Sequence, residues 1–409
     1  LADTAVIERM TASMLHRGPD GDGIYIDGAV GLGFRRLSIL DLSHAADQPM
    51  ASDDGQLILV FNGEIYNYVE LRRELESLGH QFKSTGDTEV LLHSYREWGR
   101  DCLKKFNGMW AFVIYDRRRR LLFGSRDRFG VKPMFFYRSK DCLLFASEIK
   151  AFLGSGICHS GPNWKVVSDY LLRQSLDESA ESFFEGIEKI APGSAFEVSL
   201  SGDFTTWRYW SLPEVDAEQE DDPAGQFAEL FEDAVRLRMR SDVPVGVCLS
   251  GGLDSTAIIC AMARQWGGST QPLHAFTYHA VEFDESPYIA DTIRQTQAHL
   301  NLLETNPLQA WSTLGKVLHF HDEPVHAMSA VIGFELMGLA ASKGVKVVLN
   351  GQGADEVIGG YSSYFSDYWY TLLRDGKVRE VWNEIDSFTS LHGGNNLSLF
   401  LTALRQLVK

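Results

Sequence analysis

The segment Ser250-Gly-Gly-Leu-Asp-Ser255 constrains the fold of this chain more than any other stretch. A short apolar run, 243–249, comes directly before it, and an apolar segment with helical spacing, 256–266, follows. This order predicts a buried strand, a tight glycine turn and the start of a helix. Because a helix start presents unpaired N–H groups and a positive dipole end, the turn is suited to an oligophosphate.

The side chains of this turn indicate how a phosphate chain would be held. Gly251 and Gly252 let the backbone approach an anion, and the hydroxyls of Ser250 and Ser255 add donors. Asp254 alone would repel a phosphate, but a Mg²⁺ ion between the two would make it an anchor. The turn is not a Walker A sequence, because no Gly-Lys-Ser/Thr follows. The alternative is a plain junction that Asp254 or Ser255 caps.

A second small-residue turn lies further along the chain. The apolar run 345–349 leads into Asn350-Gly-Gln-Gly-Ala-Asp-Glu356, and Gly359-Gly360-Tyr361 follows. If both runs are strands of one parallel sheet, Asp254 and Asp355 come close enough to share a Mg²⁺ ion on a leaving pyrophosphate. The alternative is that Asp355 caps a helix.

Length and composition limit the class of protein. A chain of 409 residues is too long for one compact core, so we expect two domains. A formal charge of −17 argues against a nucleic-acid partner. Five scattered cysteines without CxxC spacing are typical of the reducing cytoplasm. No apolar run approaches the roughly 20 residues of a membrane span, so we expect no membrane partner.

The first half of the chain predicts a layered α+β domain. Its β-prone runs are short and separated by charged or glycine-containing turns, which favours antiparallel sheets. Two helices are expected: 68–78, after a capping-box pattern from Asn67 to Glu70, and 88–98, after Asp87. The expected strands are 23–26, 31–39, 57–61, 110–115, 121–125, 134–137 and 143–146.

The second half predicts a parallel sheet with crossover helices. An acidic stretch at 213–223 resembles an exposed linker, and a helical stripe follows at 227–237. Nucleotides bind beyond the carboxyl ends of parallel strands, where Ser250 and Gly351 are expected to lie. The alternating runs are 243–249, 256–266, 273–278, 288–299, 330–342 and 345–349. Because the chain starts at Leu1 and an apolar helical face runs up to its last residues, we expect missing material at both ends.

Motifs from both halves occur in the order of one family. The first half contains HRGPDGDG (16–23), RRLSILD (35–41), FNGEIYN (61–67), TGDTEV (85–90), RDRFGVKP (126–133) and FASEIKA (145–151). The second contains SDVPVGVCLSGGLDS, FDESPY (283–288), HDEP (321–324) and VVLNGQGADEVIGGY. The series resembles the glutamine-dependent asparagine synthetases of the class B type. The first glycine turn also resembles the pyrophosphate loop of the N-type ATP pyrophosphatases, which cleave ATP between its α and β phosphates.

The resemblance implies an N-terminal-nucleophile glutaminase domain of layered antiparallel sheets over 1–210. A linker at 211–223 and a parallel α/β ATP pyrophosphatase domain over 224–409 follow. It also implies a cytoplasmic homodimer. In the glutaminase domain, Arg36 would hold the glutamine α-carboxylate, Asn62 and Gly63 would form the oxyanion hole, and Glu64 and Asp87 would hold the α-amino group. Each has a simpler alternative: Arg36 in a surface ion pair, Asn62-Gly63 as a turn, Asp87 as a helix cap.

In the second domain, the resemblance implies ATP contacts from Ser250, Gly252 and Ser255, with Gly251 in the same turn, and Mg²⁺ on Asp254 and Asp355. Backbone groups near Leu249, Tyr278 and Gly351 would hold the adenosine. At Gln352 the asparagine synthetases carry glutamate and the β-lactam synthetases carry tyrosine. Because a neutral amide cannot act as a general base, the identity of the acceptor acid stays open.

The family nucleophile is an N-terminal cysteine, whereas no cysteine precedes Cys102 here. We expect that the strand carrying it is missing; loss of glutaminase activity is the alternative. The predicted reaction joins ammonia from glutamine to aspartate through an acyl-adenylate and releases AMP and pyrophosphate. The alternatives are amidation of another carboxylic acid, an intramolecular amide ligase of the β-lactam synthetase type, and a non-catalytic nucleotide sensor.

Overall fold

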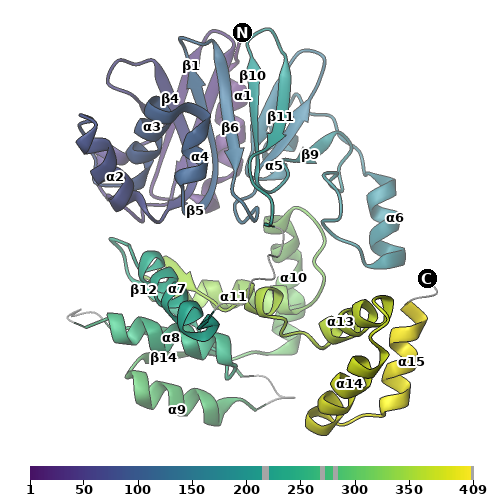
Figure 1. Cartoon of the computed structure of the whole chain (residues 1–409). Coiled ribbons are helices and arrows are strands. Elements are labelled where there is room, and N and C mark those ends of the chain that lie inside the picture. The colour runs from purple at the N-terminus through teal and green to yellow at the C-terminus, as the bar shows by residue number, and fades with distance from the viewer. Residues whose placement is uncertain (214–220, 268–271, 280–283, 407–409) are drawn as a thin grey trace.

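Two domains with different sheet types lie one above the other in the computed structural model (Figure 1). The structure describes residues 1–213, 221–267, 272–279 and 284–406. Most of the predicted linker, 214–220, lies outside these residues, as do Phe283 of the FDESPY motif and Val408 of the last helical face.

The first domain is built on antiparallel sheets, as predicted. Long apolar runs form the central strands because both of their faces are covered. The six-stranded sheet has the order β11 (Phe204–Arg208), β10 (Ser194–Ser199), β6 (Leu121–Arg126), β5 (Gly108–Asp116), β4 (Leu57–Ile65) and β3 (Met50–Ala51). Two smaller sheets accompany it: β1 (Gly21–Asp27) with β2 (Val30–Arg36), and β8 (Leu143–Ala146), β7 (Phe135–Arg138) and β9 (Ile187–Lys189).

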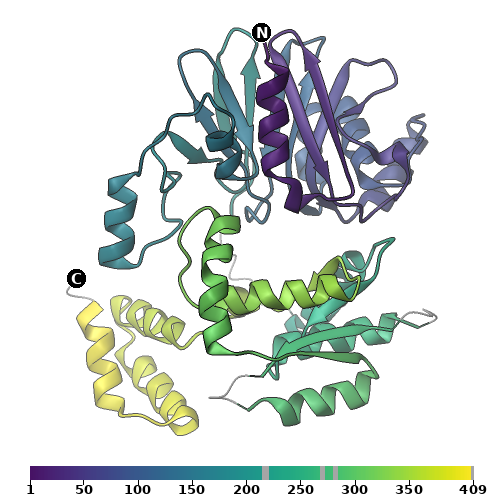
Figure 2. The same cartoon turned by 180° about the vertical axis from the view of Figure 1, so that it is seen from behind.

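Short helices flank these sheets (Figures 1 and 2). A fully buried core between α3 and the six-stranded sheet includes Leu59, Leu91 and Trp110. The helices of this domain are α1 (Thr4–Ser13), α2 (Tyr68–Ser77), α3 (Asp87–Trp98), α4 (Cys102–Lys105), α5 (Ile149–Gly154) and α6 (Trp164–Arg173).

Two local predictions in this domain are wrong. The strand expected at 31–39 ends at Arg36, because the chain turns there toward the second domain. The expected capping box at Asn67 is absent: the Asn67 side chain makes no cap bond to α2. Instead its Nδ2 donates to the carbonyl of Lys105 (2.9 Å) and its Oδ1 accepts from the N–H of Asn107 (2.9 Å). A tertiary contact therefore replaces the local cap.

The second domain contains the predicted parallel sheet. Its strands have the order β14 (His299–Leu303), β13 (His274–Tyr278), β12 (Val245–Cys248) and β15 (Val347–Leu349). The sequence was expected to be helical up to His299, but the helix ends at Thr296 and the edge strand β14 starts at His299. The surrounding helices are α7 (Pro223–Arg238), α8 (Leu253–Gln265), α9 (Ser286–Thr296), α10 (Pro307–His321) and α11 (Ser329–Ser342).

Four further helices complete the described chain: α12 (Ala354–Ile358), α13 (Ser362–Arg374), α14 (Val378–His392) and α15 (Asn396–Gln406). The last three pack around Trp369 and Val381 beside the α/β domain (Figure 2). Within the described residues, none of the helices is both long and apolar enough to cross a membrane.

The sheet order decides where the glycine turns lie. Strands β12 and β15 are direct neighbours and run parallel, with Val247 opposite Leu349. The turns that follow them, at Ser250 and Gly351, therefore leave the same edge of the sheet. Helices α10 and α11 lie between this sheet and the first domain (Figure 2).

Candidate active site

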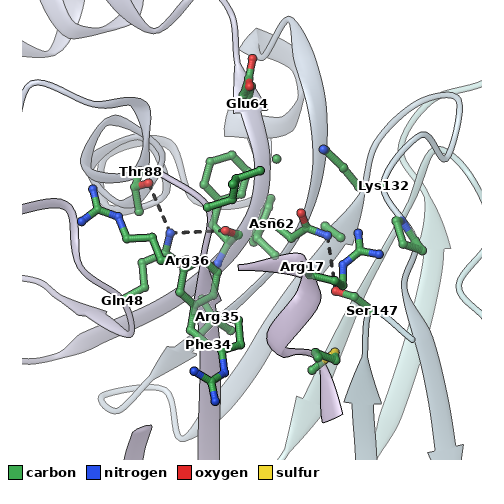
Figure 3. Close-up of a pocket in the computed structure, with 18 of the residues that line it drawn as sticks. Arg17, Phe34, Arg35, Arg36, Gln48, Asn62, Glu64, Thr88, Lys132 and Ser147 are labelled. Carbon is green, nitrogen blue, oxygen red and sulfur yellow. Dashed lines mark hydrogen bonds between the residues drawn. The ribbon is translucent and has the colours of Figure 1, made fainter. Parts of the chain in front are cut away.

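A cavity of about 690 Å³ opens in the first domain beside β2, β4 and α3. All four residues that the sequence suggested for glutamine, Arg36, Asn62, Glu64 and Asp87, line it together with Gly63. They come from three separate elements, and Figure 3 shows Arg36, Asn62 and Glu64 among the side chains that line the cavity. The wall also includes Met337 of α11, so the cavity reaches the second domain.

The guanidinium of Arg36 is held firmly at the end of β2. Its Nη1 donates to the carbonyl of Ser43 (2.9 Å) and to Asp47 Oδ1 (2.7 Å), and its Nη2 donates to the carbonyl of Asp41. Arg36 is only 8% exposed while its ion-pair partner Asp47 is about half exposed, so the guanidinium lies in a largely buried ion pair and not on the open surface. Its role toward a carboxylate stays a prediction, since two backbone carbonyls and Asp47 already use several of its donors.

Asn62 and Gly63 lie within β4 and not in a turn. Asn62 Nδ2 points toward Ser147 Oγ at 3.4 Å, near Arg17 (Figure 3). At residue 63 a side chain cannot be accommodated, because a Cβ there would stand 2.2 Å from the carbonyl oxygen of Met109 on the paired strand β5. Close strand approach therefore explains the glycine, and the oxyanion hole stays a prediction.

Glu64 and Asp87 form a buried acidic pair. Glu64 is 6% exposed; burial first and the charge of Asp87 second raise the pKa of its carboxyl group to about 7. Burial likewise raises the pKa of Asp87 to about 6, although the backbone hydrogen bonds that its carboxylate accepts lower the pKa in part. Asp87 Oδ2 accepts from the N–H of Ile65 (2.8 Å), and the N-cap of α3 is Gly86, so Asp87 does not cap the helix. The pair is suited to a bound ammonium group.

The RDRFGVKP motif contributes residues to this cavity to which the sequence analysis assigned no role. Lys132 lines the wall, and burial lowers the pKa of its ammonium group while the nearby charge of Glu64 opposes that shift. Asp127 is 1% exposed and shapes the turn that presents Lys132, because its carboxylate accepts four backbone N–H bonds. These donors are Trp110, Phe129, Val131 and Lys132. The sequence signal for this turn would have been an aspartate five residues before a lysine, with Gly130 between them.

The first glycine turn has the predicted strand–turn–helix form. Ser250 N–H donates to Ser255 Oγ (3.0 Å), and the two hydroxyl oxygens lie 2.9 Å apart. Ser255 is 4% exposed, so its hydroxyl holds the turn in shape. The N-cap of α8 is Gly252, and no side chain makes a cap hydrogen bond to this helix, so neither Asp254 nor Ser255 acts as the helix cap. Leu249, just before the turn, is buried and its N–H donates to the carbonyl of Phe276 (2.8 Å).

The second turn packs directly against the first. A Cβ on Gly351 would stand 2.9 Å from Asp254 Cβ and 3.3 Å from the backbone nitrogen of Ser255. Asp355 lies in the first turn of α12, whose N-cap is Gly353 without a side-chain cap bond, so Asp355 is not a helix cap. Across the described residues, no hydrogen bond or ion pair engages either the Asp254 or the Asp355 carboxylate.

These two carboxylates fit the predicted Mg²⁺ role in chemistry, because oxygen ligands suit a hard cation and neither carboxylate has a partner among the described residues. In the part of the chain that the structure describes, no group of three His, Cys, Asp or Glu side chains is arranged to hold a metal by itself. The remaining ligands would have to be phosphate oxygens and water.

Two other predicted site residues, Tyr278 and Gln352, are exposed. Tyr278 ends β13 and is 41% exposed. The N–H of Gln352 donates to Asn350 Oδ1 (3.1 Å).

Glu285 of the FDESPY motif reaches the first turn, a contact that the sequence analysis missed. Its Oε2 accepts from the N–H of Gly251 (3.0 Å), and its Cβ would be 2.7 Å from a Cβ on Gly251.

Cys102 does not line the cavity of the first domain. It is fully buried, and burial raises the pKa of its thiol far above the ordinary value. All five cysteines are free thiols.

Comparison with known proteins agrees with this architecture. Residues 1–210 match the family described as "Glutamine amidotransferase domain", and residues 226–404 match the one described as "Asparagine synthase". The layered first domain and the parallel second domain thus belong to two known classes: a glutamine amidotransferase domain followed by an asparagine synthase domain. More specifically, the chain belongs to the family of glutamine-hydrolysing asparagine synthetases.

Two relatives illustrate the similarity. Glutamine-hydrolysing asparagine synthetase 1 of Bacillus subtilis is 35% identical over 89% of the chain, and the chain spans 57% of that protein's length. A protein of Methanocaldococcus jannaschii, provisionally named a glutamine-hydrolysing asparagine synthetase, is 34% identical over 98% of the chain and 81% of its own length. The solved glutamine phosphoribosylpyrophosphate amidotransferase of B. subtilis covers 86% of the chain and is matched over 89% of its own. It is 15% identical with a TM-score of 0.40, a likeness too weak to carry a conclusion.

Proposed function

We propose that this protein makes asparagine from aspartate, using ATP and ammonia that is released from glutamine. The observation that carries the proposal is the packing of the two glycine turns: Gly351 abuts Asp254 at the shared edge of β12 and β15. That arrangement is suited to the phosphate chain of a nucleotide, because the N–H groups at the start of α8 and the Asp254 carboxylate lie at this edge, and Asp355 follows four residues after Gly351.

In the proposed reaction an aspartate carboxylate oxygen attacks the α-phosphorus of ATP, and the bond from that phosphorus to the bridging oxygen of the β-phosphate breaks. The products are an acyl-adenylate and pyrophosphate. Backbone groups of Gly251 and Gly252 and the hydroxyl of Ser250 hold the phosphates. Asp254 and Asp355 would bind Mg²⁺, which when bound offsets charge on the pyrophosphate. Glu285 has to release the Gly251 N–H for a phosphate to bind there.

Ammonia then attacks the acyl carbon with its lone pair, loses a proton, and AMP leaves with the electrons of the acyl–oxygen bond. The first domain would supply this ammonia. Its cavity provides Glu64 and Asp87 for the glutamine ammonium group, and Arg36 or Lys132 for its carboxylate. Met337 in the cavity wall supports a short route for ammonia, because the glutamine pocket borders the second domain.

The test is product analysis with ATP, Mg²⁺, aspartate and ammonium, which bypasses the glutaminase. We expect AMP and pyrophosphate in equal amounts, dependent on aspartate, and loss of both in Asp254→Asn. Formation of ADP and phosphate would refute the adenylation. Pyrophosphate release with other carboxylic acids but not with aspartate would keep the chemistry and reassign the acceptor.

A further inference from the structure

The two strands that lead to the glycine turns are anchored on one segment of the first domain. Asp242, three residues before β12, accepts from the N–H of Asp41 through Oδ2 (2.7 Å). Its own N–H donates to the carbonyl of Ile39 (3.0 Å). Lys346, directly before β15, donates through Nζ to Asp20 Oδ2 (2.6 Å) and to the carbonyl of Ser38 (3.4 Å). Residues 38–41, here named the anchor segment, thus touch both strand starts.

The anchor segment also sets the position of Arg36. The carbonyl of Asp41 accepts from the Arg36 guanidinium, and the carbonyl of Ser43, two residues on, accepts from it at 2.9 Å. Asp41 is 7% exposed and has a left-handed φ of 49°, which aspartate tolerates better than most residues. Its carboxylate accepts from the N–H groups of Ser43 (3.0 Å) and Thr85 (2.7 Å). The Asp41 carboxylate therefore connects the anchor segment to Thr85, which lies two residues before Asp87.

The contacts form a short path between the two sites. Strand β12 has four residues and β15 has three, so each spans on the order of 10–13 Å at about 3.3 Å per residue. They are hydrogen-bonded neighbours, so we expect a displacement of one strand to carry the other with it. A ligand that shifts or orders the turns at their carboxyl ends changes the position of their amino ends, which lie on the anchor segment.

We propose that Asp242 and Lys346 are positioning residues that couple nucleotide binding at the glycine turns to glutamine binding beside Arg36. The proposal rests on the proposed function. The residues touch neither substrate; they act through the anchor segment. Because the Lys346–Asp20 pair is about one-third exposed on each side, it adds little to stability, so its effect should show in the coupling between the sites.

The experiment is a calorimetric titration of L-glutamine into the 409-residue chain, with and without Mg²⁺ and a non-hydrolysable ATP analogue. We expect the nucleotide to tighten glutamine binding at least about 5-fold in the unmodified chain, and glutamine to tighten nucleotide binding by the same factor. In Asp242→Ala and in Lys346→Met that factor should fall to within about 2-fold of unity. Asp242→Asn should retain it, because an amide oxygen can still accept from Asp41.

The matched control is Glu323→Gln. Glu323 also joins the two domains, through the N–H of Phe183 (3.0 Å) and Lys189, but it does not touch the anchor segment. It should keep the coupling factor. The proposal is overturned if Asp242→Ala and Lys346→Met keep it, if Glu323→Gln loses it equally, or if both ligands bind the unmodified chain independently. If neither ligand binds the unmodified chain, the proposed function itself fails. Should Asp242→Ala not fold, Lys346→Met decides.

Discussion

Replacing Glu64 by glutamine should stabilise the first domain at alkaline pH and change it much less at acidic pH. Glu64 is buried in β4 beside Asp87, and burial with that neighbouring charge raises the pKa of Glu64 to about 7. The folded protein therefore binds the Glu64 proton more tightly than the unfolded chain does. Stability from this group is fully present below its ordinary pKa of 4.5 and is lost as the pH rises through about 7.

The size of the effect follows from the shift. The pKa of Glu64 rises from 4.5 in the unfolded chain to about 7 in the folded protein, and each pKa unit corresponds to about 1.36 kcal/mol. Once Glu64 is fully deprotonated, its ionisation therefore costs the folded state about 3 kcal/mol. Between about pH 5 and about pH 8 the loss amounts to about 2.5 kcal/mol. Glutamine keeps the shape without the charge, so the advantage of Glu64→Gln over the unmodified chain should grow by that amount. Since Asp87 titrates nearby, the observed midpoint belongs to the pair.

The assay is urea unfolding of the first domain, followed by tryptophan fluorescence at several pH values for both proteins. The control is Glu76→Gln, an exposed position on α2, whose difference from the unmodified chain should not change over this range. Parallel stability curves for Glu64→Gln and the unmodified chain would refute the reasoning, because burial of Glu64 would then carry no ionisation cost. Glutamine binding should also release protons below about pH 7, since a bound ammonium group favours the ionised pair.

Three further outcomes follow from the contacts. Asp254→Asn or Asp355→Asn should lower aspartate-dependent pyrophosphate release on the order of 100-fold or more and leave glutamine binding unchanged, because several kcal/mol of charge stabilisation are lost. Gly351→Ala should weaken nucleotide binding about 10-fold in a fluorescence titration, since the added Cβ stands 2.9 Å from Asp254 Cβ and displaces one turn. Asn67→Ala should lower the free energy of unfolding by about 1–3 kcal/mol in urea, because two tertiary hydrogen bonds disappear.

Local patterns predicted much of the fold because they depend on neighbours in sequence. The run before Ser250 and the periodic segment after it describe a strand, a turn and a helix wherever they are placed, and the structure has them at β12 and α8. The failures arose where distant residues compete. Asn67 carries a cap signal but bonds to the 105–107 segment, and the chain near His299 continues as a strand because β13 lies beside it.

By itself the sequence determined the class of each domain, the two glycine turns and the family, since periodicity and motif order are properties of the chain alone. Only the tertiary structure decided that Gly351 lies against Asp254, that Glu64 and Asp87 share a buried site, and that Asp242 touches Asp41. The physical reason is that burial, charge proximity and hydrogen bonding depend on distances in space. Residues far apart in the chain acquire those distances only when the strands pair and the domains pack.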